Sequence, residues 1–282
     1  MKISYYNGEF KQDSDISIDY NDRAFYFGDG VYEVIRLYNG VFYTLEAHID
    51  RLFRSIEKIG IKGIERNEIM EIIAGLQQQN QISNGYIYLQ VSRGIDRRNH
   101  SFPVNTPPAV MAYMNTIEGS AAHSKEGAAI ITSEDYRWLK CDIKSLNLLP
   151  NVLEKQRAVE QGAKEAVLHR NGIVTEGTST NVFIVKEGVL YTHPADNLIL
   201  NGITRLSVLE IAGELEIPVK EESFTLADLA AADEVFITST TLEVLAVGRV
   251  DGQTIGEGSK GPMTMRIQET FQKKTQKLNM SK

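Results

Sequence analysis

Cys141-Asp142-Ile143-Lys144-Ser145-Leu146-Asn147-Leu148-Leu149 places a single cation in an apolar segment, and no acidic residue stands three or four positions from it. A lysine in such a place either extends to solvent from an edge or is held in a dry cavity. A desolvated lysine loses proton affinity, and a neutral amine can form a Schiff base with an aldehyde. The segments downstream of Lys144 provide the evidence for choosing between these two interpretations, a surface cation or a reactive amine.

Three of these downstream features are typical of a phosphate site. Gly202-Ile203-Thr204 begins a predicted helix, where backbone N–H groups and the positive dipole end favour an anion. Ser239-Thr240-Thr241 ends a predicted strand, and Thr178-Ser179-Thr180 is a further hydroxyl cluster. Each feature alone is weak, because such runs are common in turns. Together with Lys144 they indicate pyridoxal phosphate, its aldehyde on the lysine and its phosphate on the helix terminus and hydroxyls.

This cofactor also needs a partner for its pyridine nitrogen. A carboxylate keeps the nitrogen protonated, so that the ring can absorb charge from a developing carbanion. Glu176 is the candidate, because it ends a predicted strand directly before the Thr178-Ser179-Thr180 cluster. The alternative is an exposed glutamate in a turn.

Two further groups of cations need an interpretation. Arg97, Arg98 and His100 stand within one predicted loop, a suitable place to capture a carboxylate. The alternative for them is a solvent-exposed basic loop. His48 and Arg51 lie three positions apart on one face of a predicted helix. We expect His48 to belong to a solvated polar face.

Hydrophobic periodicity and turn signals predict a small first domain at residues 1–117 and a linker at residues 118–125. Asn7-Gly8 and Asn39-Gly40 are hairpin signals, and Gly28-Asp29-Gly30 is a tight bend that uses the backbone freedom of glycine. We expect helices at residues 45–60 and 68–79, and strands at residues 31–37, 86–92 and 109–114.

Residues 126–282 form the larger second domain, in which strands alternate with a few helices. The strands are expected at residues 127–132, 165–169, 173–176, 182–186, 189–191 and 234–238. The helices are expected at residues 150–162, 203–215, 227–231 and 262–276. This content predicts the α/β (α+β) class.

Composition narrows the class of protein further. The 282 residues carry 42% hydrophobic and 24% charged residues, ordinary for a globular protein, and a net charge of −7, which argues against nucleic-acid binding. One cysteine, Cys141, excludes an intrachain disulfide and favours a reducing compartment. Without a long apolar run, we expect a cytoplasmic protein that contacts neither membrane nor nucleic acid. No metal site is predicted.

The chain also contains longer motifs, namely Phe27-Gly28-Asp29-Gly30-Val31-Tyr32-Glu33-Val34, His48-Ile49-Asp50-Arg51-Leu52, Arg137-Trp138 followed by Cys141–Asn147, Thr175–Asn181, and Gly202-Ile203-Thr204-Arg205. They resemble those of the fold-type IV (class IV) pyridoxal-phosphate aminotransferases, and among these the bacterial D-amino-acid aminotransferases. The resemblance runs nearly end to end. It implies a two-domain fold with a small N-terminal α/β domain and a larger, β-rich C-terminal α/β domain that binds pyridoxal 5′-phosphate.

The resemblance implies roles for single residues, listed here by function. Lys144 forms the Schiff base and moves the proton between the substrate Cα and the cofactor C4′, and Glu176 pairs with the pyridine nitrogen. Arg51, Thr240 and the backbone at Ile203 and Thr204 hold the phosphate, while Ser179, Arg137 and Leu200 surround the cofactor. Tyr32, Arg98 and His100 trap the substrate α-carboxylate, and Arg98 and His100 come from the neighbouring subunit of a homodimer.

The implied reaction is ping-pong transamination between D-amino acids and 2-oxo acids, such as D-alanine and 2-oxoglutarate giving pyruvate and D-glutamate. Arg97 departs from the pattern, in which a neutral residue precedes Arg98, although the Arg-x-His spacing favours Arg98. A branched-chain L-amino-acid aminotransferase or an aminodeoxychorismate lyase would share the fold but not the Arg98-x-His100 pair beside Tyr32. A rival of another class is a non-catalytic module that binds a phosphate ligand, with Lys144 a surface cation.

Overall fold

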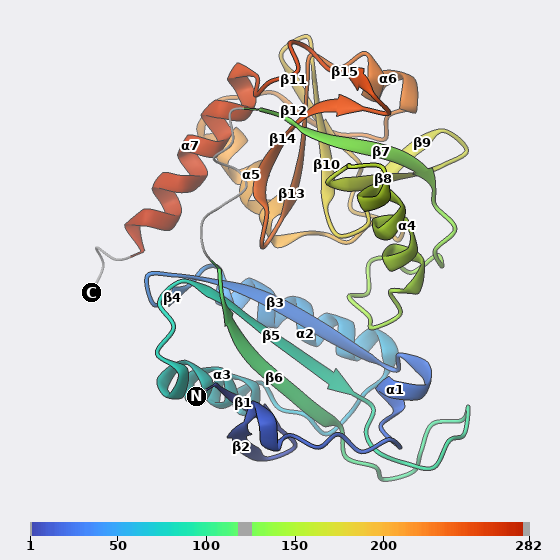
Figure 1. Cartoon of the computed structure of the whole chain (residues 1–282), viewed down its shortest axis with the longest axis vertical. Coiled ribbons are helices and arrows are strands. Elements are labelled where there is room, and N and C mark those ends of the chain that lie inside the picture. The colour runs from blue at the N-terminus through green and yellow to red at the C-terminus, as the bar shows by residue number, and fades with distance from the viewer. Residues whose placement is uncertain (1, 118–125, 279–282) are drawn as a thin grey trace. The chain divides into compact units, whose positions relative to one another are not determined.

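The computed structural model describes residues 2–117 and 126–278 (Figure 1). The expected linker, residues 118–125, lies outside the described residues. The chain forms two compact units. The first contains residues 2–117 together with Ile143–Asn147, and the second contains residues 126–142 and Leu148–Lys277. Lys144 therefore belongs to the first unit, although the sequence-based division at residues 118–125 would assign it to the second.

The first unit is built on an antiparallel sheet of six strands in the order β2-β1-β6-β5-β3-β4. The strands are β1 (Ile3–Tyr6), β2 (Glu9–Gln12), β3 (Gly30–Tyr38), β4 (Val41–Phe42), β5 (Gly85–Ser92) and β6 (Ala109–Thr116). The helical elements are η1 (Asp13–Asp15), α1 (Arg23–Phe27), α2 (Leu45–Ile59) and α3 (Arg66–Asn80). The expected strands and the two long helices are confirmed, whereas α1 was not predicted.

Both expected hairpins of this unit form. Asn7 and Gly8 have φ values of 46° and 94°, and Asn39 and Gly40 have φ values of 48° and 82°. Positive φ at both central residues matches the twist of antiparallel strands, and asparagine and glycine tolerate it best. The Gly28 bend also forms, with Gly28 at φ 60° closing α1. Gly30 requires glycine for a different reason: a Cβ there would lie 2.7 Å from the Val91 carbonyl oxygen, which is too close.

One face of this sheet packs on the two long helices. Ile87, Leu89 and Val91 alternate along β5 and are buried, as are Ile49 and Leu52, three positions apart on α2. These periods of two and of three to four residues place one apolar face of each element in a common core. The intervening tyrosines lie on the other face, where the ring centroid of Tyr88 lies 5.7 Å from that of Tyr32 and 5.1 Å from that of Tyr113.

The segment Ile143–Asn147 joins the first unit by pairing with β3. The Tyr32 N–H donates to the Lys144 carbonyl oxygen at 3.0 Å, and the Leu146 N–H donates to the Gly30 carbonyl oxygen at 3.0 Å. Ile143 is 6% exposed and is part of the core of the first unit. The apolar residues around Lys144 thus serve to dock this short segment, which fixes the backbone of the lysine.

The second unit is built on a mixed sheet of nine strands in the order β12-β11-β10-β13-β14-β7-β8-β9, with β15 paired to β14. The strands are β7 (Ala128–Glu134), β8 (Glu165–Arg170), β9 (Ile173–Gly177), β10 (Asn181–Lys186), β11 (Val189–Thr192), β12 (Val219–Glu221), β13 (Glu234–Ser239), β14 (Glu243–Val250) and β15 (Gln253–Thr254). The helices are α4 (Leu149–Glu160), α5 (Ile203–Glu214), α6 (Leu226–Ala230) and α7 (Pro262–Lys277).

The expected elements of the second unit are confirmed, and the α/β class with them. The strands β12, β14 and β15 were not predicted. Seven of the eight β14 residues are buried, so its sequence shows no alternation. The equally buried β10 and β13 were nevertheless predicted from their apolar runs. The strand β14 pairs with β13 on one side and with β7 on the other. Among the described residues, no helix combines the length and apolar character needed to cross a bilayer.

Candidate active site

Lys144 is held at a defined place in the first unit. Its N–H donates to Ser55 Oγ at 3.3 Å, and its carbonyl oxygen accepts from Tyr32. The neighbours Ile143 and Ser145 are 6% and 5% exposed. The Nζ atom lies 4.3 Å from the ring centroid of Tyr32, a cation–π contact. The structure therefore brings together Lys144 and Tyr32, two of the residues predicted for the site.

Arg51 lies in a buried cluster with Glu33 and His48. Its Nε donates to Glu33 Oε1 at 2.7 Å and its Nη2 to Oε2 at 2.8 Å, while His48 Nδ1 lies 2.8 Å from Oε2. The expectation of a solvated His48 was wrong, because this side chain is only 2% exposed. The face of α2 that carries it packs on β3, and a polar group is buried without penalty when it is hydrogen-bonded. Glu33, which the sequence analysis did not single out, supplies that partner.

Charge sets the protonation of this cluster. Burial alone would raise the pKa of Glu33, but Arg51 and then His48 hold it well below its usual range. Burial lowers the pKa of His48, against the opposing effect of Glu33. The cluster therefore consists of an ionised carboxylate, a guanidinium and a neutral imidazole.

The loop between β5 and β6 carries Arg98 and His100 on its exposed surface. The guanidinium carbon of Arg98 lies 5.2 Å from the ring centroid of Phe27, and the ring centroid of His100 lies 5.3 Å from the same point. The two side chains predicted to bind a carboxylate thus share one aromatic support. Arg97 is also exposed, and its N–H donates to Asp96 Oδ1 at 2.6 Å.

In the second unit, Glu176 is a buried acceptor at the end of β9. Arg137 Nη1 donates to Oε1 at 2.7 Å, and Oε2 accepts from the Leu200 N–H at 2.9 Å and from Asn181 Nδ2 at 3.2 Å. Glu176 is 5% exposed, which excludes an exposed turn glutamate. Arg137 and Leu200 were predicted to surround the cofactor, and here both hold Glu176.

Asp135 and Glu176 both accept hydrogen bonds from the Arg137 guanidinium. The arginine Nε and Nη2 donate to the two oxygens of Asp135, both at 2.9 Å. Although burial opposes it, Arg137 lowers the pKa of Asp135. Burial raises the pKa of Glu176 to about 7, against the lowering effect of Arg137. Glu176 therefore has donors on both oxygens and a pKa suited to sharing a proton near neutrality.

The hydroxyl cluster after Glu176 is organised by a residue that the sequence did not reveal. Glu165, on β8, is fully buried and accepts from the hydroxyls of Thr178, Ser179 and Thr180, as well as from the Ser179 N–H. The available signal was a glutamate at the start of an apolar strand, Glu165-Ala166-Val167-Leu168, because a buried carboxylate needs donors.

The start of α5 is packed against the support of Glu176. Gly202 precedes the helix, and no side chain caps its N-terminus, where the first N–H groups have no partner within the helix. A Cβ on Gly202 would lie 2.1 Å from Asn181 Oδ1. Glycine at this position lets Asn181 reach both Glu176 and the Leu200 carbonyl oxygen. Thr240 is half-buried in the turn between β13 and β14.

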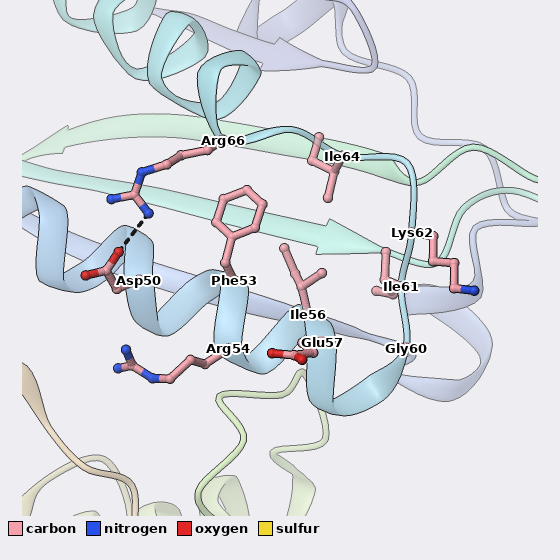
Figure 2. A pocket seen from close by; sticks show the side chains of 10 residues that line it. All are labelled: Asp50, Phe53, Arg54, Ile56, Glu57, Gly60, Ile61, Lys62, Ile64 and Arg66. Carbon is pink, nitrogen blue, oxygen red and sulfur yellow. Dashed lines mark hydrogen bonds and ion pairs between the residues drawn. The ribbon is translucent and has the colours of Figure 1, made fainter.

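A pocket of about 600 Å³ also lies in the first unit, between the C-terminal half of α2 and the connection to α3 (Figure 2). Phe53 and Ile56 project from α2 toward that connection, and Arg66 reaches Asp50 at 2.7 Å. None of the residues predicted for the active site lines this pocket.

Comparison with known proteins identifies the class to which this fold and these residues belong. A model of the family described as Amino-transferase class IV matches residues 30–250. The chain belongs to the class IV aminotransferase family, as the motifs predicted. It is 47% identical over 275 residues to a D-alanine aminotransferase of Staphylococcus aureus (strain N315), covering 97% of this chain and 98% of that protein. It is 48% identical over 273 residues to the D-alanine aminotransferase of Bacillus licheniformis, covering 96% of each.

Solved structures agree with this assignment. The branched-chain aminotransferase from the thermophilic archaeon Thermoproteus uzoniensis, with norvaline, superposes with a TM-score of 0.86 at 27% identity, covering 97% of this chain and 94% of that one. The branched-chain amino acid aminotransferase from Escherichia coli gives a TM-score of 0.89 at 29% identity, covering 96% and 92%. The predicted fold-type IV architecture is confirmed.

Proposed function

We propose that the chain catalyses pyridoxal-phosphate-dependent transamination between D-amino acids and 2-oxo acids, in the manner of D-alanine and 2-oxoglutarate giving pyruvate and D-glutamate. The observation that carries the chemistry is Glu176, buried and held by three donors with its pKa raised to about 7. The preference for the D-series is supported by 46–48% identity to D-alanine aminotransferases, against 27% and 29% to the two branched-chain enzymes.

The residues of each unit fit pyridoxal phosphate. When bound, the cofactor supplies an aldehyde that condenses with a primary amine and a ring that withdraws electrons from the substrate α-carbon. Glu176 would hold its pyridine nitrogen, and Lys144 would hold its aldehyde. The uncapped N-terminus of α5, through the N–H groups of Ile203 and Thr204, suits its phosphate, together with Arg51 and Thr240. Ser179, whose hydroxyl and N–H donate to Glu165, would surround the cofactor.

Lys144 supplies the acid–base chemistry. Its Nζ accepts the proton from the substrate α-carbon and returns it on the next step, so one group serves as base and acid. The docked segment fixes its backbone, and the Tyr32 ring at 4.3 Å supports the amine. Glu176 stabilises positive charge on its partner nitrogen through its own negative charge. Arg137, which is itself bound by Asp135, helps to hold the carboxylate in one orientation.

Arg98 and His100, with Tyr32, bind the substrate α-carboxylate. A guanidinium offers two donors in the plane of a carboxylate, and a protonated or neutral imidazole adds a third. We propose that Arg98 and His100 serve the active site of the partner in a homodimer. Their exposure on the β5–β6 loop supports this arrangement.

The test is an assay of the purified enzyme loaded with pyridoxal phosphate, using D-alanine or L-alanine with 2-oxoglutarate. We expect pyruvate and D-glutamate from D-alanine only, and a visible absorption band that D-alanine alone bleaches. Lys144→Ala should reduce turnover by about 10³-fold or more while still binding cofactor weakly. Bleaching and turnover with L-alanine or L-isoleucine alone would replace the D-specific function by the branched-chain one. A protein that stays colourless with added cofactor would be a non-catalytic module.

A further inference from the structure

The loop that carries Arg98 and His100 is tied down by a buried arginine of α1. Arg23 is 3% exposed, and its Nη1 donates to the Asn99 carbonyl oxygen at 2.6 Å and to the Ser101 carbonyl oxygen at 3.3 Å. These two carbonyls flank His100 in the sequence. One guanidinium therefore fixes the backbone on both sides of a residue whose side chain is exposed.

Arg23 is itself fixed by an acidic residue. Its Nε donates to Asp29 Oδ2 at 2.8 Å, and Asp29 also accepts from Arg93 Nε at 2.8 Å and from Arg93 Nη2 at 2.9 Å. Arg93 Nη2 continues to the Ile59 carbonyl oxygen at 2.8 Å, at the end of α2. Although burial opposes it, the hydrogen bonds from Arg93 and Arg23 lower the pKa of Asp29. The loop is thereby connected through charged groups to the rigid part of the first unit.

Phe27, the last residue of α1, supports the side chains of the loop. Its ring centroid lies 4.8 Å from the guanidinium carbon of Arg23, 5.2 Å from that of Arg98 and 5.3 Å from the ring centroid of His100. Figure 1 shows α1 beside the connection between β5 and β6 that carries these residues. One ring thus contacts both predicted carboxylate ligands and the arginine that holds their backbone.

We propose that Arg23 and Phe27 are positioning residues that preset Arg98 and His100 for the α-carboxylate shared by every amino-acid and oxo-acid substrate. The proposal rests on the proposed function, in which Arg98 and His100 bind that carboxylate. An exposed loop that must order on binding loses affinity to conformational entropy, and a pre-organised loop avoids this loss. Because the α-carboxylate is common to both half-reactions, the effect falls equally on the amino donor and the oxo acceptor.

Phe27→Leu in the full-length enzyme loaded with cofactor is the direct test. It removes the ring and keeps an apolar side chain. We expect the KM values for D-alanine and for 2-oxoglutarate to rise together by about tenfold, with kcat changed less than about twofold. Phe27→Tyr keeps the ring and should restore both KM values. Arg23→Lys keeps the charge beside Asp29 but loses the forked geometry, and should act as Phe27→Leu does. Phe25→Leu is the matched control, since Phe25 is 75% exposed on the same helix.

A double-mutant cycle separates positioning from mere structural support. In an Arg98→Gln, His100→Gln background, Phe27→Leu should raise neither KM further, because it acts through those two side chains. The same fold-change in KM in both backgrounds, or a loss of kcat or bound cofactor instead, would overturn the proposal. If Arg98→Gln, His100→Gln itself leaves KM unchanged, the carboxylate role under the proposed function fails, and the positioning role fails with it. If that double variant raises KM and Phe27→Leu does not, only the positioning role fails.

Discussion

Two buried glutamates, one in each unit, face an arginine, yet their pKa values move in opposite directions. Glu33 is held well below its usual range, whereas Glu176 is raised to about 7. Both are buried, so desolvation alone cannot separate them. The difference in pKa comes from the number of guanidinium nitrogens that donate to each glutamate.

Arg51 donates with Nε and Nη2 to the two oxygens of Glu33, and His48 adds a third contact. Arg137 gives Glu176 one nitrogen only, because its Nε and Nη2 are bound to Asp135. Asp135 also raises the pKa of Glu176 directly by its negative charge. The first pair is a two-point ion pair that satisfies Glu33 and orients Arg51 for the phosphate role proposed above. The second leaves a carboxylate that can still take up a proton or a positively charged partner.

The largest expected effect comes from breaking the ion pair of Glu33 and Arg51. Glu33→Gln leaves the Arg51 guanidinium buried without its counter-charge, and breaking such a pair costs about 3–5 kcal/mol. We expect that loss in the free energy of unfolding, measured by urea titration of the chain without cofactor. Glu46→Gln is the control, because Glu46 pairs with Arg66 at the exposed surface. A loss for Glu33→Gln no larger than for this control would show that the pair does not stabilise the fold.

Replacing the open carboxylate should affect catalysis more than folding. Glu176→Gln keeps the shape and can still accept from the Leu200 N–H, but it cannot carry the negative charge that stabilises a protonated ring nitrogen. We expect kcat to fall by about 10²-fold or more, as for other losses of electrostatic stabilisation. The free energy of unfolding should change by less than about 1 kcal/mol. Unchanged kcat in a folded, cofactor-loaded variant would remove Glu176 from the proposed mechanism.

Some residues of the candidate site could be predicted from local sequence and others could not. Lys144 and Glu176 could both be selected from their local sequence. Lys144 is the single cation of an apolar segment, and Glu176 ends a strand directly before a cluster of hydroxyl residues. Most strands, helices and turns followed from period and turn chemistry in the same way. The buried strands β10 and β13 were predicted as short apolar runs without alternation, whereas the equally buried β14 was missed.

The supporting residues could not be found because their roles arise from long-range pairing. Glu33 meets Arg51 and His48 only once β3 packs on α2, and Glu165 meets the 178–180 hydroxyls only once β8 pairs with β9. The solvated interpretation of His48 failed for this reason. A polar residue beside an apolar stripe is exposed unless another element brings it a partner, and sequence spacing within one helix does not show that element.

The smallest expected effect is a pH dependence that tests the neutral state of His48. Its folded-state pKa is lowered below the ordinary value of 6.5, so below pH 6.5 the unfolded chain binds a proton that the folded chain does not. The stability of the native protein relative to His48→Gln should therefore be full above pH 6.5. It should fall as the pH drops from there, by at most about 1.4 kcal/mol per pH unit, and level off below the folded-state pKa. Urea titrations of both proteins at a series of pH values measure this difference. If the native protein instead gained stability over His48→Gln on acidification, His48 would be charged in the folded state. Glu33 would then pair with two cations, His48 and Arg51.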